Sequence, residues 1–343
     1  MTSKKLFIFV FLLITSAFSQ EPKLSLIPFD TPDPTALIAD DGSGIYVFTT
    51  AAGIRITRSK NLIDWEHAGQ VFDTKVPQWA AEVVPGAKGI WAPDIVRVNG
   101  LYYLYYSVST FGGQHSVIGL AVNKTLNPKS AAYKWEDRGI VLGSAPGKTD
   151  YNAIDSALFV DDDGKAYLFW GSYWSGIKAV EVDSKTGKPF KYSDQALKIP
   201  ADYISAATRK RSDDTSIEAP FVIKHDGNYY LFTSRGSCCD GVNSTYHITV
   251  GRSKTPLGEY IDKEGKSMSK GGGTTILTSN ERWKGTGHNG IFKYKNKDYI
   301  ILAAYDKTQP EKGRLTQIRE LNWDKENFPI TGEVINTPIE ITE

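Results

Sequence analysis

The sequence has only two cysteines among its 343 residues, Cys238 and Cys239, and they are adjacent. An exported fold that depends on disulfides for its stability would carry more of them. Adjacent cysteines form a disulfide only with strain, so we expect both thiols to be reduced. No spacing of cysteine and histidine fits a zinc site. The cysteines therefore predict neither a disulfide framework nor a structural zinc ion.

The sequence also lacks an excess of charge of either sign, with 40 basic and 39 acidic residues and a net charge of +1. This balance argues against nucleic acid or an anionic membrane surface as a partner. No segment has the 3.6-residue apolar period of a helix. Aromatic residues are plentiful at 12%, which suits β-strands and sugar-stacking surfaces, although most such rings pack in a core.

The first 19 residues have the features of a secretory signal peptide. Lys4 and Lys5 form a basic start, an apolar run follows, and Ala17-Phe18-Ser19 is a small-x-small cleavage site. The apolar run is too short to span a bilayer, and no later segment is a transmembrane candidate. We therefore expect an exported protein, secreted or periplasmic, whose single domain covers residues 20–343.

A short phrase recurs five times along that domain, each time followed by an apolar strand, a turn and a Tyr-rich strand. The phrases carry a polar residue at intervals of 61, 61, 63 and 70 residues, namely Asp33, Asp94, Asp155, Glu218 and His288. Asn-Gly or Asp-Gly, the preferred hairpin turn, follows the first four phrases. Fixed-period repetition of a multi-strand unit predicts an all-β fold, a five-bladed β-propeller.

A propeller brings the first residues of its inner strands to one mouth of a central channel, where acids distant in sequence would meet. Buried carboxyls cost desolvation free energy and repel one another, so a purely structural repeat needs them only as caps of strand ends. Two carboxyls that face one sugar are what glycosidic hydrolysis requires. The insertions at 74–90 and 191–216 are expected to shape a cleft over the mouth.

The ordered motifs resemble those of the arabinan endo-1,5-α-L-arabinosidases of glycoside hydrolase family 43, which are five-bladed propellers, over residues 28–330. The motifs include Trp91-Ala92-Pro93-Asp94-Ile95, Asn152-Ala153-Ile154-Asp155, Ser172-Tyr173-Trp174-Ser175-Gly176, Ile217-Glu218-Ala219-Pro220, Cys238-Cys239 with Ser244-Thr245-Tyr246, and Gly287-His288-Asn289. The resemblance implies hydrolysis of internal α-1,5 bonds of arabinan, with inversion at the anomeric carbon.

Carried over residue by residue, the resemblance implies that Asp33 is the general base and Glu218 the general acid. It implies that Asp155 is a third carboxylate, which raises the pKa of the acid and orients it. Pro32 stands where family members commonly have histidine, which leaves the tuning of the base open. The residues implied to bind substrate are Asp33, Trp91, Phe111, Gly112, Asn152, Ala153, Ile154, Asp155, Ser172, Tyr173 and Trp174, with Trp91 and Phe111 stacking on arabinose rings.

The same resemblance places His288 in the central channel beside a calcium ion, most of whose other ligands are water. The residues alone favour this poorly, because calcium prefers oxygen ligands and a lone histidine is usually a core residue. The resemblance thus predicts Ca²⁺ as a cofactor, with His288 as its protein ligand.

Two alternatives stay open at this point. One is an exo-acting arabinanase or arabinofuranosidase of the same family, because a loop that blocks one side of a groove gives exo action. The other is a non-catalytic carbohydrate-binding propeller, which would need no acid–base pair. In each case we expect a monomer that binds arabinan or arabino-oligosaccharides, with no nucleic-acid or membrane partner.

Overall fold

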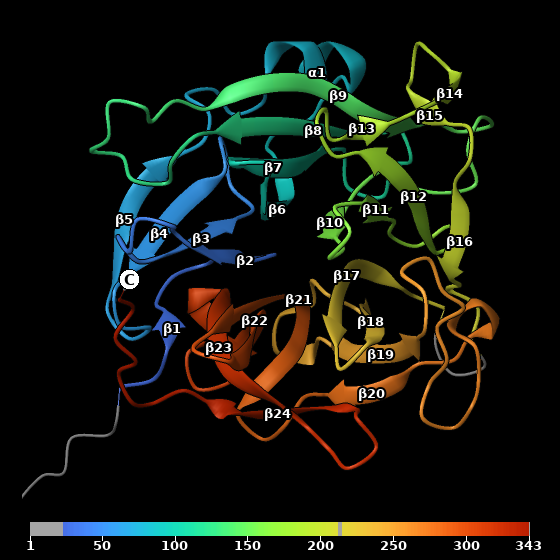
Figure 1. The fold of residues 1–343 in the computed structure, drawn as a ribbon. Coiled ribbons are helices and arrows are strands. Elements are labelled where there is room, and N and C mark those ends of the chain that lie inside the picture. Colours follow the sequence, from blue (N-terminus) through green and yellow to red (C-terminus); the bar gives the residue numbers. More distant parts are fainter. Residues whose placement is uncertain (1–22, 212–214, 343) are drawn as a thin grey trace, which may run out of the picture.

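The computed structural model describes residues 23–211 and 215–342, so the predicted signal peptide lies outside the described residues. Almost all regular structure in these ranges is strand, arranged as five sheets around a central axis (Figure 1). The predicted all-β, five-bladed propeller is confirmed. Within the described ranges, no helix has the length and apolar character needed to cross a membrane.

The blades follow one another along the chain, each with its inner strand first. The first blade contains β2 (Thr35–Ile38), β3 (Ile45–Thr49), β4 (Arg55–Ser59) and β5 (Trp65–Gln70). The second contains β6 (Trp91–Val98), β7 (Leu101–Val108), β8 (Ser116–Asn123) and β9 (Glu136–Ser144). The third contains β10 (Ala157–Val160), β11 (Ala166–Trp170), β12 (Ile177–Asp183), β13 (Lys188–Pro189) and β16 (Ile204–Ala207).

The last two blades complete the ring. The fourth contains β17 (Glu218–His225), β18 (Asn228–Arg235), β19 (His247–Ser253) and β20 (Thr274–Leu277). The fifth contains β21 (Trp283–Tyr294), β22 (Lys297–Asp306), β23 (Arg314–Trp323), β24 (Pro329–Val334) and β1 (Leu26–Ile27). Outside the blades are α1 (Gln78–Val83), the pair β14 (Tyr192–Asp194) and β15 (Ile199–Pro200), and three short 3₁₀ turns: η1 (Gly241–Asn243), η2 (Met268–Lys270) and η3 (Pro310–Lys312). The helix α1 has six residues, too few to show a 3.6-residue period in the sequence.

Tight two-residue turns join the two innermost strands of several blades. In three of these hairpins both turn residues have positive φ: Asn99-Gly100, Asp226-Gly227 and Lys295-Asn296. This geometry matches the right-handed twist of the strands that the turn connects. The predicted turns therefore set the register of the hairpins, with Val98 opposite Leu101 and His225 opposite Asn228.

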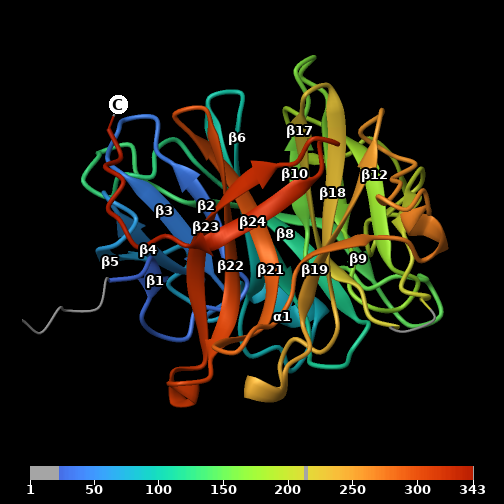
Figure 2. The ribbon, with the colours of Figure 1, turned by 90° about the horizontal axis from the view of Figure 1, so that it is seen from below.

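The hydrophobic core consists of five clusters, one between each pair of neighbouring blades. Successive side chains of a strand point to opposite faces, so each blade contributes to two clusters. On β7, for example, Leu104 and Tyr106 pack towards the first blade, whereas Tyr103 and Tyr105 pack towards the third. Figure 2 shows the ring from the side, with the blades standing next to one another.

The chain closes the ring by pairing its first described strand with its last blade. Strand β1 is antiparallel to β23, with Leu26 opposite Gln317. Beyond it, the N–H of Thr31 donates to the carbonyl oxygen of Arg314 at 2.8 Å, and Thr316 donates its hydroxyl to the carbonyl oxygen of Thr31 at 2.8 Å. We call these contacts between residues 26–31 and 314–317 the seam.

Candidate active site

In each blade one residue other than glycine adopts a left-handed conformation, which lies at or near the start of the inner strand in the first four blades and midway along β21 in the fifth. These residues are Asp33 (φ 54°), Ala92 (41°), Asp155 (57°), Ala219 (52°) and His288 (52°). Such a backbone costs about 1–3 kcal/mol for each residue and persists where the surrounding structure enforces it, as at functional sites. In the first, third and fifth blades, the left-handed residue is itself one of the predicted site residues.

This backbone marker corrects the predicted equivalence of the five polar residues. Glu218 precedes its left-handed neighbour Ala219 by one residue, and Asp94 follows Ala92 by two. Because of this offset, Asp94 occupies a different position from Asp33 on its strand. The intervals between the polar residues are nearly constant, but they differ by one or two residues from the intervals between the left-handed residues. The bulges in β6 and β17 lie at the same place relative to the left-handed residue in both blades.

Asp94 has a structural role in the ring. Its side chain is buried, and its carboxylate accepts hydrogen bonds from the N–H of Leu158 at 2.9 Å and the hydroxyl of Thr35 at 3.2 Å. It thereby links the first, second and third blades. Burial raises its pKa to about 7, although both hydrogen bonds act in the opposite direction.

A cleft of about 950 Å³ brings the predicted site residues together. Those that line it are Asp33, Trp91, Phe111, Gly112, Asn152, Ile154, Asp155, Ser172, Tyr173, Trp174, Glu218 and His288. Ala153 does not line the cleft: it is fully buried, and its N–H donates to the hydroxyl of Ser144. Of the two insertions, 191–216 contributes Arg209 to the lining, whereas 74–90 contributes no residue.

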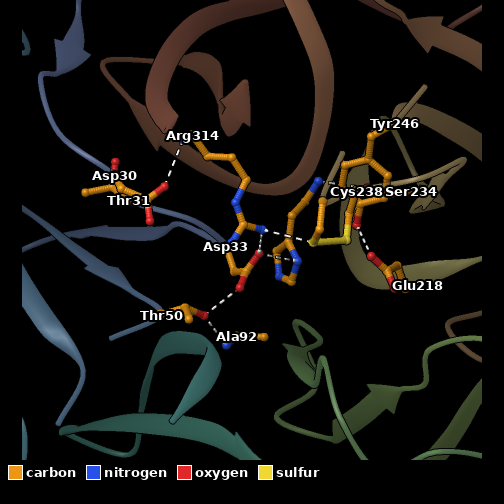
Figure 3. A network of polar contacts seen from close by, with 12 residues as sticks. Asp30, Thr31, Asp33, Thr50, Ala92, Glu218, Ser234, Cys238, Tyr246 and Arg314 are labelled. Carbon is orange, nitrogen blue, oxygen red and sulfur yellow. Dashed lines mark hydrogen bonds and ion pairs between the residues drawn. A yellow bond between two sulfur atoms is a disulfide. The ribbon is translucent and has the colours of Figure 1, made fainter. Parts of the chain in front are cut away.

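Asp33 lies beside Arg314 and Thr50 (Figure 3) and also contacts the ring of His288. Its Oδ1 is 3.3 Å from Nδ1 of His288 and 3.5 Å from Nη1 of Arg314, and its Oδ2 accepts a hydrogen bond from Thr50. Burial raises the pKa of Asp33, but the charge that His288 carries when protonated, the charge of Arg314 and the hydrogen bond from Thr50 outweigh burial and hold the pKa below its usual value. Asp33 is therefore ionised at neutral pH, as a general base must be.

Glu218 is held from two blades. Tyr246, just before β19, donates its phenolic hydrogen to Oε1 at 2.6 Å, and Ser172 of the third blade donates its hydroxyl to Oε2 at 2.8 Å. Burial and the nearby carboxylates of Glu218 and Asp155 raise the pKa of Tyr246 well above its usual value, so the phenol stays protonated and remains a donor. These two hydrogen bonds fix the orientation of the Glu218 carboxyl group.

Asp155 completes the group of acids. Burial raises its pKa well above the usual value, the charges of Glu218 and Asp33 raise it further, and only the N–H of Ala219 opposes them. The raised pKa of Asp155 favours a proton in one part of the cleft, while the lowered pKa of Asp33 favours its ionised form in another. This separation of protonation states is what general acid–base catalysis on one substrate needs.

Three residues that contact the acids were not predicted to do so: Thr50, Arg314 and Tyr246. Tyr246 is in a motif quoted above, but the motif gave it no role. Arg314 begins β23, and Thr50 directly follows β3. Alternate strand ends of every blade meet at the same mouth of the channel. The position of these residues at strand ends could therefore have identified them, but sequence alone locates strand ends poorly.

Cys238 and Cys239 form a disulfide, so the expectation of a reduced pair is wrong. The loop between β18 and β19 turns both side chains to the same side, where their sulfurs meet. Both residues line the cleft, and Nη1 of Arg314 lies 3.7 Å from the sulfur of Cys239. The strain of an adjacent disulfide is a property of the two cysteines themselves, whereas the loop that holds them decides whether their sulfurs meet.

The groups around His288 decide whether the predicted calcium ion fits there. Burial lowers the pKa of His288, and the charges of Asp33 and Glu218 do not overcome this, so the ring is neutral. Among residues 23–211 and 215–342, no cluster of three His, Cys, Asp or Glu side chains stands ready for a metal. The next residue, Asn289, is buried, and both polar atoms of its side chain lack a partner. His288 thus offers one neutral ring nitrogen, and a calcium ion held there would take water as most of its other ligands.

Known proteins similar to this chain were identified by sequence and by structure. The model of "Glycosyl hydrolases family 43" matches residues 23–329. An extracellular exo-α-(1→5)-L-arabinofuranosidase of Cellvibrio japonicus is 42% identical over 89% of this chain and 87% of its own length. An extracellular endo-α-(1→5)-L-arabinanase of Bacillus subtilis is 39% identical over 85% of this chain and 84% of its own length.

A solved structure has the same architecture. The α-L-arabinanase of Cellvibrio cellulosa, determined as a complex with arabinohexaose, superposes with a TM-score of 0.79 at 39% identity. The match covers 88% of this chain and 95% of that one.

Proposed function

Since the chain belongs to family 43 of the glycosyl hydrolases, we propose that it hydrolyses internal α-1,5-L-arabinofuranosidic bonds of arabinan with inversion. The observation that carries this proposal is the convergence of Asp33, Asp155 and Glu218 from three blades in one cleft. A carbohydrate-binding propeller without catalysis would have no use for this costly group of buried acids.

In the proposed reaction, Asp33 accepts a proton from a water molecule, which attacks the anomeric carbon. Glu218 protonates the departing glycosidic oxygen, and Tyr246 and Ser172 orient its carboxyl group for this transfer. Asp155 lies close enough to Glu218 for the charge of Glu218 to raise the pKa of Asp155, which places a second buried carboxyl group beside the proposed acid. Since the water lies between base and substrate, we expect the carboxyl groups of Asp33 and Glu218 to be about 6.5–9.5 Å apart.

Exo action is the second candidate, because the relative from Cellvibrio japonicus is named as an exo-enzyme and the one from Bacillus subtilis as an endo-enzyme. Phe111 favours a chain that extends past the reacting sugar, since its ring is 86% exposed and lines the cleft. The deciding experiment is the time course of products from linear and branched arabinan. Oligosaccharides of mixed length at early times support endo action; a single short product from the first minutes supports exo action.

The same experiment, followed by proton magnetic resonance, tests inversion. The first product should carry the anomeric configuration opposite to that of the bond cleaved. A product with retained configuration would contradict the role of Asp33 as a base that acts through water. Absence of any hydrolysis of arabinan by the folded protein would contradict the proposed function as a whole.

We further propose that the neutral ring of His288 holds a calcium ion in the channel, with water as most of its other ligands. Such an ion would supply positive charge near the acids and rigidity between the blades. Metal analysis of the purified protein should find calcium, and a chelator should lower the melting temperature. His288→Ala should have lost both the calcium and the response to the chelator. An unchanged melting temperature in the wild type with chelator would contradict the site.

Export and a monomeric state complete the proposal. Residues 1–19 have the pattern of a signal peptide, and the two relatives described above are named as extracellular proteins. Expression with the full sequence should place the protein outside the cytoplasm, with a new N-terminus near Gln20. Sedimentation of the purified protein should give the mass of one chain.

A further inference from the structure

The disulfide of Cys238 and Cys239 cannot be explained by the overall stability of the fold. A disulfide stabilises a protein chiefly by closing a loop in the unfolded chain, and the effect grows with the length of that loop. A disulfide between adjacent residues encloses almost no loop. The pair therefore contributes little to global stability, and its position in the cleft calls for a local explanation.

The loop that carries the disulfide is firmly held on both sides. The N–H of Ser237 donates to the hydroxyl of Thr245 at 3.0 Å, and Ser244 donates its hydroxyl to the carbonyl oxygen of Ser237. At the entrance to the loop, a side chain on Gly236 would collide with the carbonyl oxygen of Thr245, only 2.4 Å from the Cβ position. The sulfurs are thus presented to the cleft from a defined backbone.

The disulfide lies between the partners of the two principal acids. One nitrogen of Arg314 is within 3.7 Å of the sulfur of Cys239 and within 3.5 Å of the carboxylate of Asp33 (Figure 3). Six residues after Cys238 the same loop reaches Ser244, and it then leads into Tyr246, which donates to Glu218. One short segment therefore contacts the partner of the base and carries the partner of the acid.

The oxidised pair also gives the cleft wall a particular surface. Cys239 is exposed, Cys238 is half-buried, and both line the cleft. A disulfide has no S–H donor and no thiol to ionise, and its sulfurs are soft and polarisable. Such a surface suits the apolar C–H face of a sugar ring, whereas two thiols would rotate and would titrate beside a guanidinium group.

We propose that the Cys238–Cys239 disulfide is a substrate-positioning element of this cleft: its sulfurs pack against a sugar unit of the chain, and they hold Arg314 beside Asp33. This inference rests on the proposed function, because the sugar unit belongs to an arabinan chain. It assigns the oxidised pair a part in binding and in the arrangement of the reacting groups, and no covalent step.

Two double variants separate the two parts of the role. Cys238→Ala with Cys239→Ala removes both the sulfur surface and the acceptor near Arg314. Cys238→Ser with Cys239→Ser removes the sulfur surface but keeps oxygen acceptors there. We expect both to raise KM for arabino-oligosaccharides about tenfold, equivalent to about 1.4 kcal/mol of binding free energy. Only the alanine variant should also show a clear fall in kcat.

Binding is measured separately in a hydrolysis-deficient background, with Glu218→Gln alone and with Glu218→Gln combined with the serine pair. Titration calorimetry with arabinohexaose should show about tenfold weaker binding for the combined variant. Equal affinities would overturn the proposal. A wild-type protein that neither hydrolyses arabinan nor binds arabinohexaose would instead contradict the proposed function, so the two failures are distinguishable.

A reductant provides an experiment without any substitution. The chain has no other cysteines, so a phosphine reductant can act on the wild type only at this pair. The serine variant, which lacks both cysteines, should not respond to the reductant. Thiol titration confirms reduction, and the melting temperature confirms that the fold persists. We expect KM to rise by a similar factor on reduction. A fully reduced, folded wild type with unchanged KM would overturn the proposal even if the variants failed to fold.

Discussion

The phenol of Tyr246 donates a hydrogen bond of 2.6 Å to Oε1 of Glu218. The tyrosine ring packs against the backbone of Gly287, where an added Cβ would lie only 2.1 Å from the ring. The Tyr246 side chain is therefore held between the backbone of the fifth blade on one side and Glu218 on the other. Tyr246 thus orients the carboxyl group of Glu218, the residue proposed as the general acid.

Tyr246→Phe should lower kcat on arabinan about tenfold to a hundredfold, because a buried hydrogen bond that orients the acid is lost while the ring still fills its space. Initial rates at saturating substrate measure this effect. Tyr106→Phe is a matched control: its phenol donates to Asp137 at 2.9 Å, away from the cleft. Equal losses in the two variants would contradict a specific role for Tyr246.

Glu218→Ala and Asp33→Ala should differ in their response to the leaving group. An aryl arabinoside with an acidic phenol needs no proton on departure, so Glu218→Ala should retain far more of the wild-type rate on it than on arabinan. Asp33→Ala should be severely impaired on both, since every substrate needs an activated water. Each group contributes about 10²–10⁴-fold, so the contrast is measurable. Equal losses of folded Glu218→Ala on both substrates would remove the assignment of the acid.

Asp94 should make the stability of the ring depend on pH. Its pKa in the folded protein is about 7, above the ordinary value of 3.8, so the folded state binds its proton more tightly than the unfolded chain does. Its contribution is therefore most favourable below pH 4 and is lost as the pH rises to about 7. The stability of wild type relative to Asp94→Asn should fall over this range by up to a few kcal/mol. Denaturant unfolding at several pH values measures it; a pH-independent difference would contradict this expectation.

Phe111→Ala should affect long substrates more than short ones. The ring is 86% exposed at the cleft, and covering it with a sugar unit removes apolar surface from water. We expect KM for arabinohexaose to rise about tenfold, with kcat nearly unchanged and little effect on arabinotriose. Phe190→Ala, a change to another exposed ring outside the cleft, should leave both substrates unaffected. The same rise in KM for both lengths would place Phe111 beside the reacting sugar.

Sequence predicted the fold well because the repeat and its turns are local signals. Asp226-Gly227 and Asn99-Gly100 occupy the hairpin turns expected of them, since positive φ is a property of the residues themselves. The equivalence of Asp94 with Asp33 was wrong, because a difference of two residues in the spacing of the blades moves a side chain along its strand without changing the approximate period. Ala153 was carried over with its motif, although its side chain lies in the core.

The partners of the acids escaped prediction for a different reason. Arg314 is 281 residues from Asp33, and Tyr246 is 28 residues from Glu218. No local pattern connects such positions; only the closed ring does. Reduced cysteines were expected because the strain of an adjacent disulfide is a property of the two residues alone. Whether the two sulfurs meet depends instead on the loop and on the blades that flank it.

The seam gives the ring a preferred place to open. Asp33 belongs to the first blade, and both nitrogen groups beside it, on His288 and Arg314, belong to the fifth. Local opening of a protein costs less free energy than global unfolding. Among the described strands, the only pairing at the seam is that of β1, which has two residues, with β23, and a hydrophobic cluster packs the fifth blade against the first. Warming should therefore separate the base from its partners while the blades are still intact. Heat inactivation would then precede melting and reverse on cooling, and amide hydrogens along β1 and β23 would exchange with solvent before those of the other blades.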